Sequence, residues 1–124
     1  MEVNFKMENI AKVPFIAGKV KKVEKTYNEK NANEAYPIAI SVIEIICVLI
    51  IEKHFHKKVN NSAIINLANI LKENGEIEIH NLLIALVSKA ERLDEYDEYE
   101  LNFVLISIDR IVEISLEKYP EALS

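Results

Sequence analysis

The histidines are the residues of this chain best suited to bind a metal or to transfer protons. Two of the three, His54 and His56, lie two residues apart in the stretch EKHFHKK, residues 52–58. On a helix, side chains at this spacing point about 200° apart and cannot hold the same metal ion. Histidine and lysine also suit the last turn of a helix, whose unpaired carbonyls carry partial negative charge. We therefore expect both histidines to lie exposed or half-exposed at a helix end and to bind no metal.

The other candidates for catalysis or cofactor binding lack the spacing that such chemistry requires. Cys47 is the single cysteine, which excludes an internal disulfide and a cysteine zinc cage, and it lies in an apolar run typical of a core. No HExxH or ExxH pattern includes His80 or another histidine. Gly18 and Gly75 are the only glycines, too few for a phosphate-binding loop or a nucleophile elbow. We expect no cofactor, no metal and no enzymatic activity.

The most polar stretch is AERLDEYDEYE, residues 90–100, with six acids among its last ten residues. It lacks the alternating oxygen ligands and central glycine of a calcium loop. Two interpretations stay open. The stretch is a solvated loop leading into the acidic first turn of a helix, or it is a recognition surface for a basic partner, with tyrosines as amphipathic anchors. The predicted partner-binding residues are Arg92, Asp94, Glu95, Tyr96, Asp97, Glu98 and Tyr99.

Positive charge gathers near the N-terminus. Residues 1–30 hold seven lysines and four acids, whereas residues 60–124 hold five basic and thirteen acidic residues. In an alternative function, a nucleic-acid adaptor, the phosphate contacts would come from Lys19, Lys21, Lys22 and Lys25. The net charge of −5 and the presence of only two arginines argue against this role. We therefore expect no nucleic acid as a partner.

The composition predicts one all-α domain over residues 1–124. Half of the residues are hydrophobic, and two glycines and three prolines supply too few turns for an all-β fold. The longest apolar stretch, residues 37–51, has 15 residues and includes Glu44. A membrane span needs about 20 residues, so we expect a core helix and no membrane. The N-terminal residues carry acids and lysines where a secretory signal needs an apolar run, and a cytoplasmic location is expected.

The apolar spacing predicts a bundle of four long helices and a shorter one, with a central helix at about residues 34–58. Asn31 or Asn33 is the expected cap of this central helix, and Pro37 its first-turn proline. Asn74-Gly75 is typical of a helix stop. Asp97 followed by Glu100 is a capping box. The other predicted helices cover residues 14–28, 63–73, 78–93 and 97–118.

The chain resembles a HEPN-type helical bundle over roughly residues 34–116. The resemblance is carried by EAYPIAISVIEIICVLII (34–51), LANILKENGEI (67–77) and LLIALVSKAERLDEYDEYELNFVLISIDRIVEI (82–114). It implies a small, often dimeric helical domain of a prokaryotic toxin–antitoxin or defence system. Active members cleave RNA with an Arg-x4-6-His motif. Here Arg92 is the arginine at the comparable place and no histidine follows it, so the resemblance implies a non-catalytic member.

Three hypotheses follow from these observations. The first is a non-catalytic module of protein–protein contact, homodimeric, because the helices at 34–58 and 98–118 hold more isoleucine and leucine than one small core needs. The second is a HEPN-like ribonuclease with a degenerate site at Arg92 and Tyr99. The third is the nucleic-acid adaptor that uses the N-terminal lysines.

Overall fold

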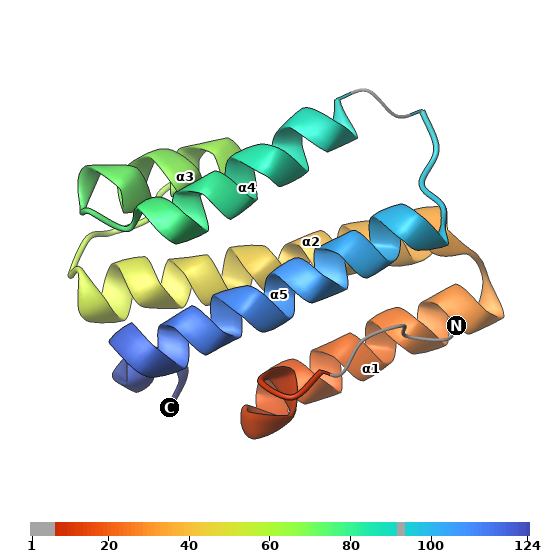
Figure 1. The fold of residues 1–124 in the computed structure, drawn as a ribbon, viewed down its shortest axis with the longest axis horizontal. Helices are drawn as coiled ribbons and strands as arrows, with labels where there is room; N and C mark the ends of the chain where they lie inside the picture. Colours follow the sequence, from red (N-terminus) through yellow and green to blue (C-terminus); the bar gives the residue numbers. More distant parts are fainter. Residues whose placement is uncertain (1–6, 92–93) are drawn as a thin grey trace. The chain divides into compact units, whose positions relative to one another are not determined.

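The computed structural model describes residues 7–91 and 94–124, and in these residues it contains five α-helices and no strand. The helices are α1 (Pro14–Glu29), α2 (Ala32–Leu49), α3 (Ile64–Glu73), α4 (Ile77–Ala90) and α5 (Glu98–Lys118) (Figure 1). There are also three short helical turns, η1 (Ile10–Lys12), η2 (Ile50–His54) and η3 (Pro120–Leu123). The predicted fold class, an all-α bundle of four long helices and a shorter one, is confirmed.

The described chain divides into two compact units. One holds the described residues from Met7 to Ile43 together with residues 94–113, and the other holds the described residues from Glu44 to Glu91 together with residues 114–124. The divisions fall inside α2 and α5, so each unit contains part of both helices. The first unit adds η1 and α1, and the second adds η2, α3, α4 and η3.

Helix α1 confirms the predicted helix at residues 14–28 and buries one apolar stripe. Pro14 occupies the first turn, where its missing N–H costs no hydrogen bond. Ile16, Val20 and Val23 are fully buried, and Tyr27, one turn further along the same stripe, is half-buried. The stripe therefore places the helix against its neighbours and leaves its lysines in solvent.

Helix α2 begins at the cap that the sequence predicted. The Asn31 side chain accepts a hydrogen bond of 2.9 Å from the backbone N–H of Glu34. Because the helix starts at Ala32, Pro37 lies in its second turn, not in the first turn as predicted. A proline at that position has no N–H to donate to the carbonyl four residues earlier.

The central helix ends four residues earlier than the predicted residue 58. Its last turn is the π-helical η2, in which Phe55 N–H donates to the carbonyl of Ile50 at 3.3 Å. A π turn accommodates one extra residue, and both Ile50 and Ile51 are fully buried. His56 then adopts a left-handed conformation with φ of 56°, which takes the chain out of the helix.

Helix α2 and η2 together form a 23-residue helical segment, Ala32–His54, with a mean hydropathy of 2.2 over its most apolar stretch. By length and composition alone, this segment is able to cross a membrane. The length of the segment therefore does not distinguish a core helix from a membrane span, as the sequence argument assumed. Burial supports a core helix, because half of the apolar stretch is buried inside the protein.

The apolar side chains of α2 are not all buried to the same degree. Ala39, Ile43 and Ile46 are fully buried. Five further apolar side chains are only half-buried: Ile38, Ile40, Ile45, Val48 and Leu49. Neighbours thus cover α2 only in part, and Leu49 is partly accessible.

Helices α3 and α4 form a hairpin around the predicted Asn74-Gly75 stop (Figure 1). Gly75 has a φ of 87°, which glycine adopts without steric cost. Its N–H donates to the Lys72 carbonyl at 3.0 Å, and Glu76 N–H donates to the Leu71 carbonyl at 2.8 Å. These two bonds form a Schellman motif that pairs the last carbonyls of α3. Helix α4 ends at Ala90, and its predicted end, Leu93, lies outside the described residues.

Helix α5 buries one apolar stripe along its length. It ends as expected before Pro120, which starts η3. The stripe residues are all buried: Leu101, Val104, Leu105, Ile108, Ile111, Val112 and Ser115.

Candidate protein-interaction surface

The start of α5 is organised by the predicted capping box. The Asp97 carboxylate accepts hydrogen bonds from the backbone N–H groups of Tyr99 at 2.8 Å and Glu100 at 3.2 Å. In return, the Glu100 carboxylate accepts from Asp97 N–H at 3.1 Å. These acids satisfy N–H groups that the first helical turn leaves unpaired. The confirmed capping box fixes the direction in which α5 leaves the acidic segment.

Tyr96 packs within the protein by one face of its ring. Its ring stacks on Tyr36, with centroids 3.8 Å apart and planes 3° from parallel. Its backbone N–H donates to the side-chain oxygen of Asn33 at 2.6 Å. Burial, with a contribution from Tyr96, raises the pKa of the buried Tyr36 phenol. The stack holds the acidic segment against α2, so only the rest of the Tyr96 ring remains for the predicted partner contact.

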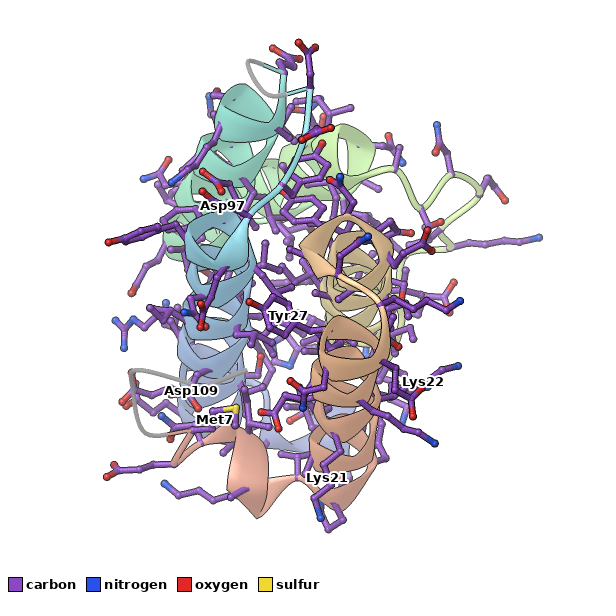
Figure 2. The ribbon with its side chains drawn as sticks, turned by 90° about the vertical axis from the view of Figure 1, so that its right-hand side faces the viewer. Met7, Lys21, Lys22, Tyr27, Asp97 and Asp109 are labelled. Atoms are coloured by element: carbon purple, nitrogen blue, oxygen red, sulfur yellow. The ribbon has the colours of Figure 1, made fainter. Side chains whose placement is uncertain are left out.

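Glu98 links α5 to α1. The Tyr27 hydroxyl donates to the Glu98 carboxylate at 3.4 Å, and Figure 2 shows Tyr27 between the two helices. Desolvation and the nearby Glu98 charge raise the pKa of Tyr27. Asp94 and Glu95 are exposed, while Arg92, the remaining residue of the predicted surface, lies outside the described residues.

Tyr99 is the most exposed large apolar or aromatic side chain of the described residues, with 82% of its surface accessible. It borders a pocket of about 230 Å³ whose other lining residues are Asp97, Glu98 and Asn102. The Asn102 side-chain oxygen is buried and has no hydrogen-bond partner in the described part of the chain. The carboxylates and the aromatic ring are groups that attract a cation.

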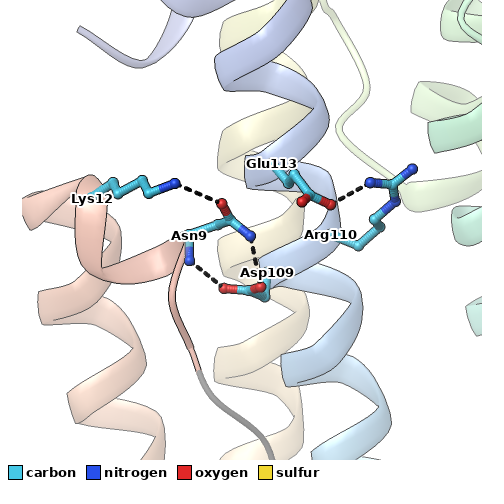
Figure 3. Close-up of polar contacts among 5 residues, drawn as sticks. All are labelled: Asn9, Lys12, Asp109, Arg110 and Glu113. Carbon is cyan, nitrogen blue, oxygen red and sulfur yellow. Dashed lines mark hydrogen bonds and ion pairs between the residues drawn. The ribbon is translucent and has the colours of Figure 1, made fainter.

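An apolar stripe continues from Tyr99 along the outer side of α5. Residues three or four apart share one side of a helix. On this side of α5 the stripe consists of Tyr99, Phe103 and Ile106, and Arg110 follows it. Ile106 is 47% exposed and Phe103 is half-buried. Arg110 is exposed and forms an ion pair with Glu113 (Figure 3). We call the side chains of Tyr99, Asn102, Phe103, Ile106 and Arg110 the α5 face.

The N-terminal lysines lie on the solvent side of α1. Lys19, Lys21, Lys22 and Lys25 are all exposed. Lys21 and Lys22 point away from α5 in Figure 2. Lys25 forms an i,i+4 ion pair with Glu29 at 3.9 Å. These exposed ammonium groups are therefore accessible to an anionic ligand such as a phosphate group.

The EKHFHKK stretch folds against the C-terminal turn. His54 Nδ1 bonds to the Glu121 carboxylate, and its ring lies 4.5 Å from the Tyr119 ring, centroid to centroid. The hydrogen bond from His54 lowers the pKa of Glu121. His56 is exposed in an open hollow of about 410 Å³, lined also by Glu52, Lys57 and Lys58. In residues 7–91 and 94–124, no three histidine, cysteine or acidic side chains gather as a metal site would require.

Replacing both His54 and His56 with glutamine should leave the protein nearly as stable as the wild type. His56 is exposed and His54 is about one-third exposed, and the favourable effect of a charged imidazole near a helix C-terminus is about 0.3–1 kcal/mol. Urea unfolding followed by circular dichroism measures the change. Stoichiometric zinc in the purified wild type that disappears in the double variant would show that the stretch is a metal site.

Cys47 and His80 occupy structural positions. The Cys47 thiol is fully buried, and burial, with the charges of Glu44 and Glu76, raises its pKa to about 12. A thiol with that pKa carries almost no thiolate at neutral pH and is a poor nucleophile. His80 Nδ1 bonds to the carbonyl of Ala68 at 2.8 Å, which ties α4 to α3.

Glu76 is a fully buried acid that sequence reasoning missed. It is 0% exposed and caps α4, where its carboxylate accepts from Ile79 N–H at 3.0 Å. The same carboxylate accepts from Lys118 Nζ at 3.2 Å and from the Tyr119 hydroxyl at 2.5 Å. Burial raises the pKa of Glu76, but these hydrogen bonds outweigh burial and leave the pKa below its ordinary value. The role of this arrangement is to stabilise the fold.

A second unforeseen contact joins the N-terminal turn η1 to α5. The Asp109 carboxylate accepts from the backbone N–H groups of Asn9 and Ile10, each at 3.0 Å, and from the Asn9 side chain at 3.1 Å (Figure 3). An acid within an apolar helix stripe is the only sequence signal for this contact. Asp109 thus holds η1 against α5.

No protein family, curated protein or solved structure matches this chain. The resemblance to a HEPN-type bundle therefore stays a prediction from the helical pattern.

Proposed function

We propose that this protein is a non-catalytic helical module that acts by protein–protein contact, as a cytoplasmic homodimer. The observation that carries the proposal is the α5 face. It places Tyr99, 82% exposed, and Ile106, 47% exposed, on one side of one helix. Burying such side chains against a partner is favourable by roughly 25 cal/mol for each Å² of apolar surface.

Further exposed apolar surface supports contact with another chain. Among the described residues, Phe15, Ile65 and Ile77 are also exposed, and five apolar side chains of α2 are half-buried. Burying such side chains against another chain is favourable. The surplus of isoleucine and leucine in the sequence thus corresponds to accessible surface on α2 and α5.

The surroundings of the reactive side chains support a non-catalytic role. His54 pairs with Glu121, His80 bonds to a backbone carbonyl and the Cys47 thiol is buried. General acid–base catalysis requires a titratable group within reach of a substrate. The ribonuclease alternative would need Arg92 and Tyr99 to act without a following histidine. Membership of a toxin–antitoxin or defence system is part of the proposal and rests on the HEPN resemblance alone.

The purified chain should form dimers at micromolar concentration. A contact formed by one helix face is smaller than the roughly 800 Å² per partner of stable interfaces, so we expect a Kd of about 10–100 µM. Sedimentation equilibrium should show the mass rising from 14.2 kDa toward twice that value as concentration increases. A mass that stays at 14.2 kDa up to about 500 µM would contradict the proposal.

A further inference from the structure

We infer that two copies of the chain pair through antiparallel α5 faces, with Arg110 of each copy seated in the Tyr99 pocket of the other. The inference rests on the proposed function, because it assumes that the chain forms a homodimer. It adds the residues of the contact, the direction of the helices and the occupant of the pocket.

The spacing along α5 makes the face self-complementary. Tyr99 and Arg110 are eleven residues apart, which is about three helical turns and about 16 Å along one side of the helix. A two-fold axis midway between them would place Tyr99 of one copy opposite Arg110 of the other, twice. The same axis would place Phe103 opposite Ile106 of the second copy at the centre. Two-fold dimers use one such self-complementary patch.

The charges at the two ends of the face are opposite. The pocket beside Tyr99 is lined by the carboxylates of Asp97 and Glu98 and by Asn102, whose buried side-chain oxygen has no hydrogen-bond partner in the described residues. The other end of the face carries Arg110, which is exposed. A guanidinium has five N–H donors and stacks on aromatic rings. It can therefore keep its bond to Glu113 while it pairs with the carboxylates of Asp97 and Glu98 and packs on the Tyr99 ring of the second copy.

The antiparallel direction follows from the same charge distribution. In a parallel pair, the acidic start of one α5 would lie beside the acidic start of the other, and like charges repel. In an antiparallel pair with this register, each acidic N-terminal end instead meets Arg110 of the partner helix. A single partner helix thus covers the apolar centre and both charged ends.

A reciprocal charge exchange tests the pairing. Arg110→Glu would place a carboxylate in an acidic pocket, and Glu98→Lys would place an ammonium group in the pocket that receives Arg110. Each variant alone should dimerise at least about tenfold more weakly than wild type. In an equimolar mixture, the new carboxylate at position 110 of one chain would meet the new ammonium group at position 98 of the other. The wild-type Arg110 and Glu98 that remain would also face each other, so the mixture should regain dimers close to the wild-type Kd.

Two controls complete the experiment. Lys72→Glu makes the same charge change as Arg110→Glu at an exposed position of α3, and should dimerise like wild type. Tyr99→Ala removes a side chain that is 82% exposed, so it should fold normally and still weaken dimerisation about tenfold. Circular dichroism verifies folding of each variant.

The outcomes separate the two proposals. A wild type that is monomeric throughout would refute the homodimer itself. If the wild type dimerises and Arg110→Glu and Tyr99→Ala dimerise equally well, the homodimer stands but the α5 face is wrong. If both single charge variants are weakened and their mixture is not restored, the antiparallel pairing is wrong. Restoration in the mixture, with Lys72→Glu unaffected, is the expected result.

Discussion

Replacing Glu76 with alanine should lower the free energy of unfolding by about 2–4 kcal/mol, because one carboxylate serves three donors. The change removes the cap of α4 at Ile79 N–H and the acceptor of the Tyr119 hydroxyl. Tyr119 is buried, so its hydroxyl would lose a partner that water cannot fully replace. Lys118 is half-exposed and can be solvated again, which limits the loss.

The matched control is Glu78→Ala, in the first turn of the same helix. Glu78 is exposed and its main expected effect is a favourable interaction with the helix dipole, about 0.3–1 kcal/mol. Chemical denaturation of both variants under identical conditions gives the comparison. Equal losses for Glu76→Ala and Glu78→Ala would mean that the buried network contributes no more than the charge of an acid near a helix N-terminus.

The Glu76 contribution should also depend on pH. The pKa of Glu76 is lower in the folded protein than its ordinary value, so folding favours the charged carboxylate. This contribution is complete above the ordinary glutamate pKa of about 4.3 and is lost as the pH falls through the lower folded-state value. The difference in unfolding free energy between wild type and Glu76→Gln should therefore be larger at pH 7 than near pH 3. If the difference in unfolding free energy instead increased as the pH fell, the pKa of Glu76 would have to be raised in the folded protein, contrary to this prediction.

Truncating Ile46 to alanine should cost about 2–5 kcal/mol, the range for large core side chains. Ile46 is 0% exposed in the central helix, and the surrounding side chains cannot fully close the cavity that truncation leaves. Thermal and urea unfolding measure the loss.

Leu49→Ala is a matched comparison for Ile46→Ala. It removes the same number of carbon atoms three residues along the same helix, but Leu49 is only half-buried. We expect a clearly smaller loss for Leu49→Ala, and a small loss for Val48→Ala, whose side chain is also half-buried. Similar losses for Ile46 and Leu49 would mean that Leu49 is covered in solution, as contact with a second chain through α2 would produce.

The local signals in the sequence predicted the helices well because each signal and its effect lie within one or two turns. The Asp97–Glu100 capping box and the Gly75 stop depend on hydrogen bonds between residues at most five apart. The buried stripe of α5 follows from the 3.6-residue period alone. Where a boundary was wrong, as at residue 58, the helix ends in a π turn followed by the left-handed His56, and no apolar pattern specifies either feature.

The candidate surface was predicted only in part. The sequence identified the acidic segment and both tyrosines, but not that Tyr96 stacks on Tyr36 while Tyr99 remains exposed. The two tyrosines have nearly the same sequence surroundings. Their difference arises from the position of α2, a neighbour that is distant in the chain.

The sequence by itself determined the helical class, most of the helix starts and stops, and which side of each helix is apolar, since these depend on backbone hydrogen bonds and side-chain period within one element. Only the tertiary structure decided which apolar side chains are covered and which acids are buried. Glu76 meets Tyr119 across 43 residues, and Asn9 meets Asp109 across 100. Such contacts form when packing brings distant elements together. A carboxylate at a helix start therefore has the same local signature in solvent as in a core, and only its neighbours distinguish Glu76 from Glu78.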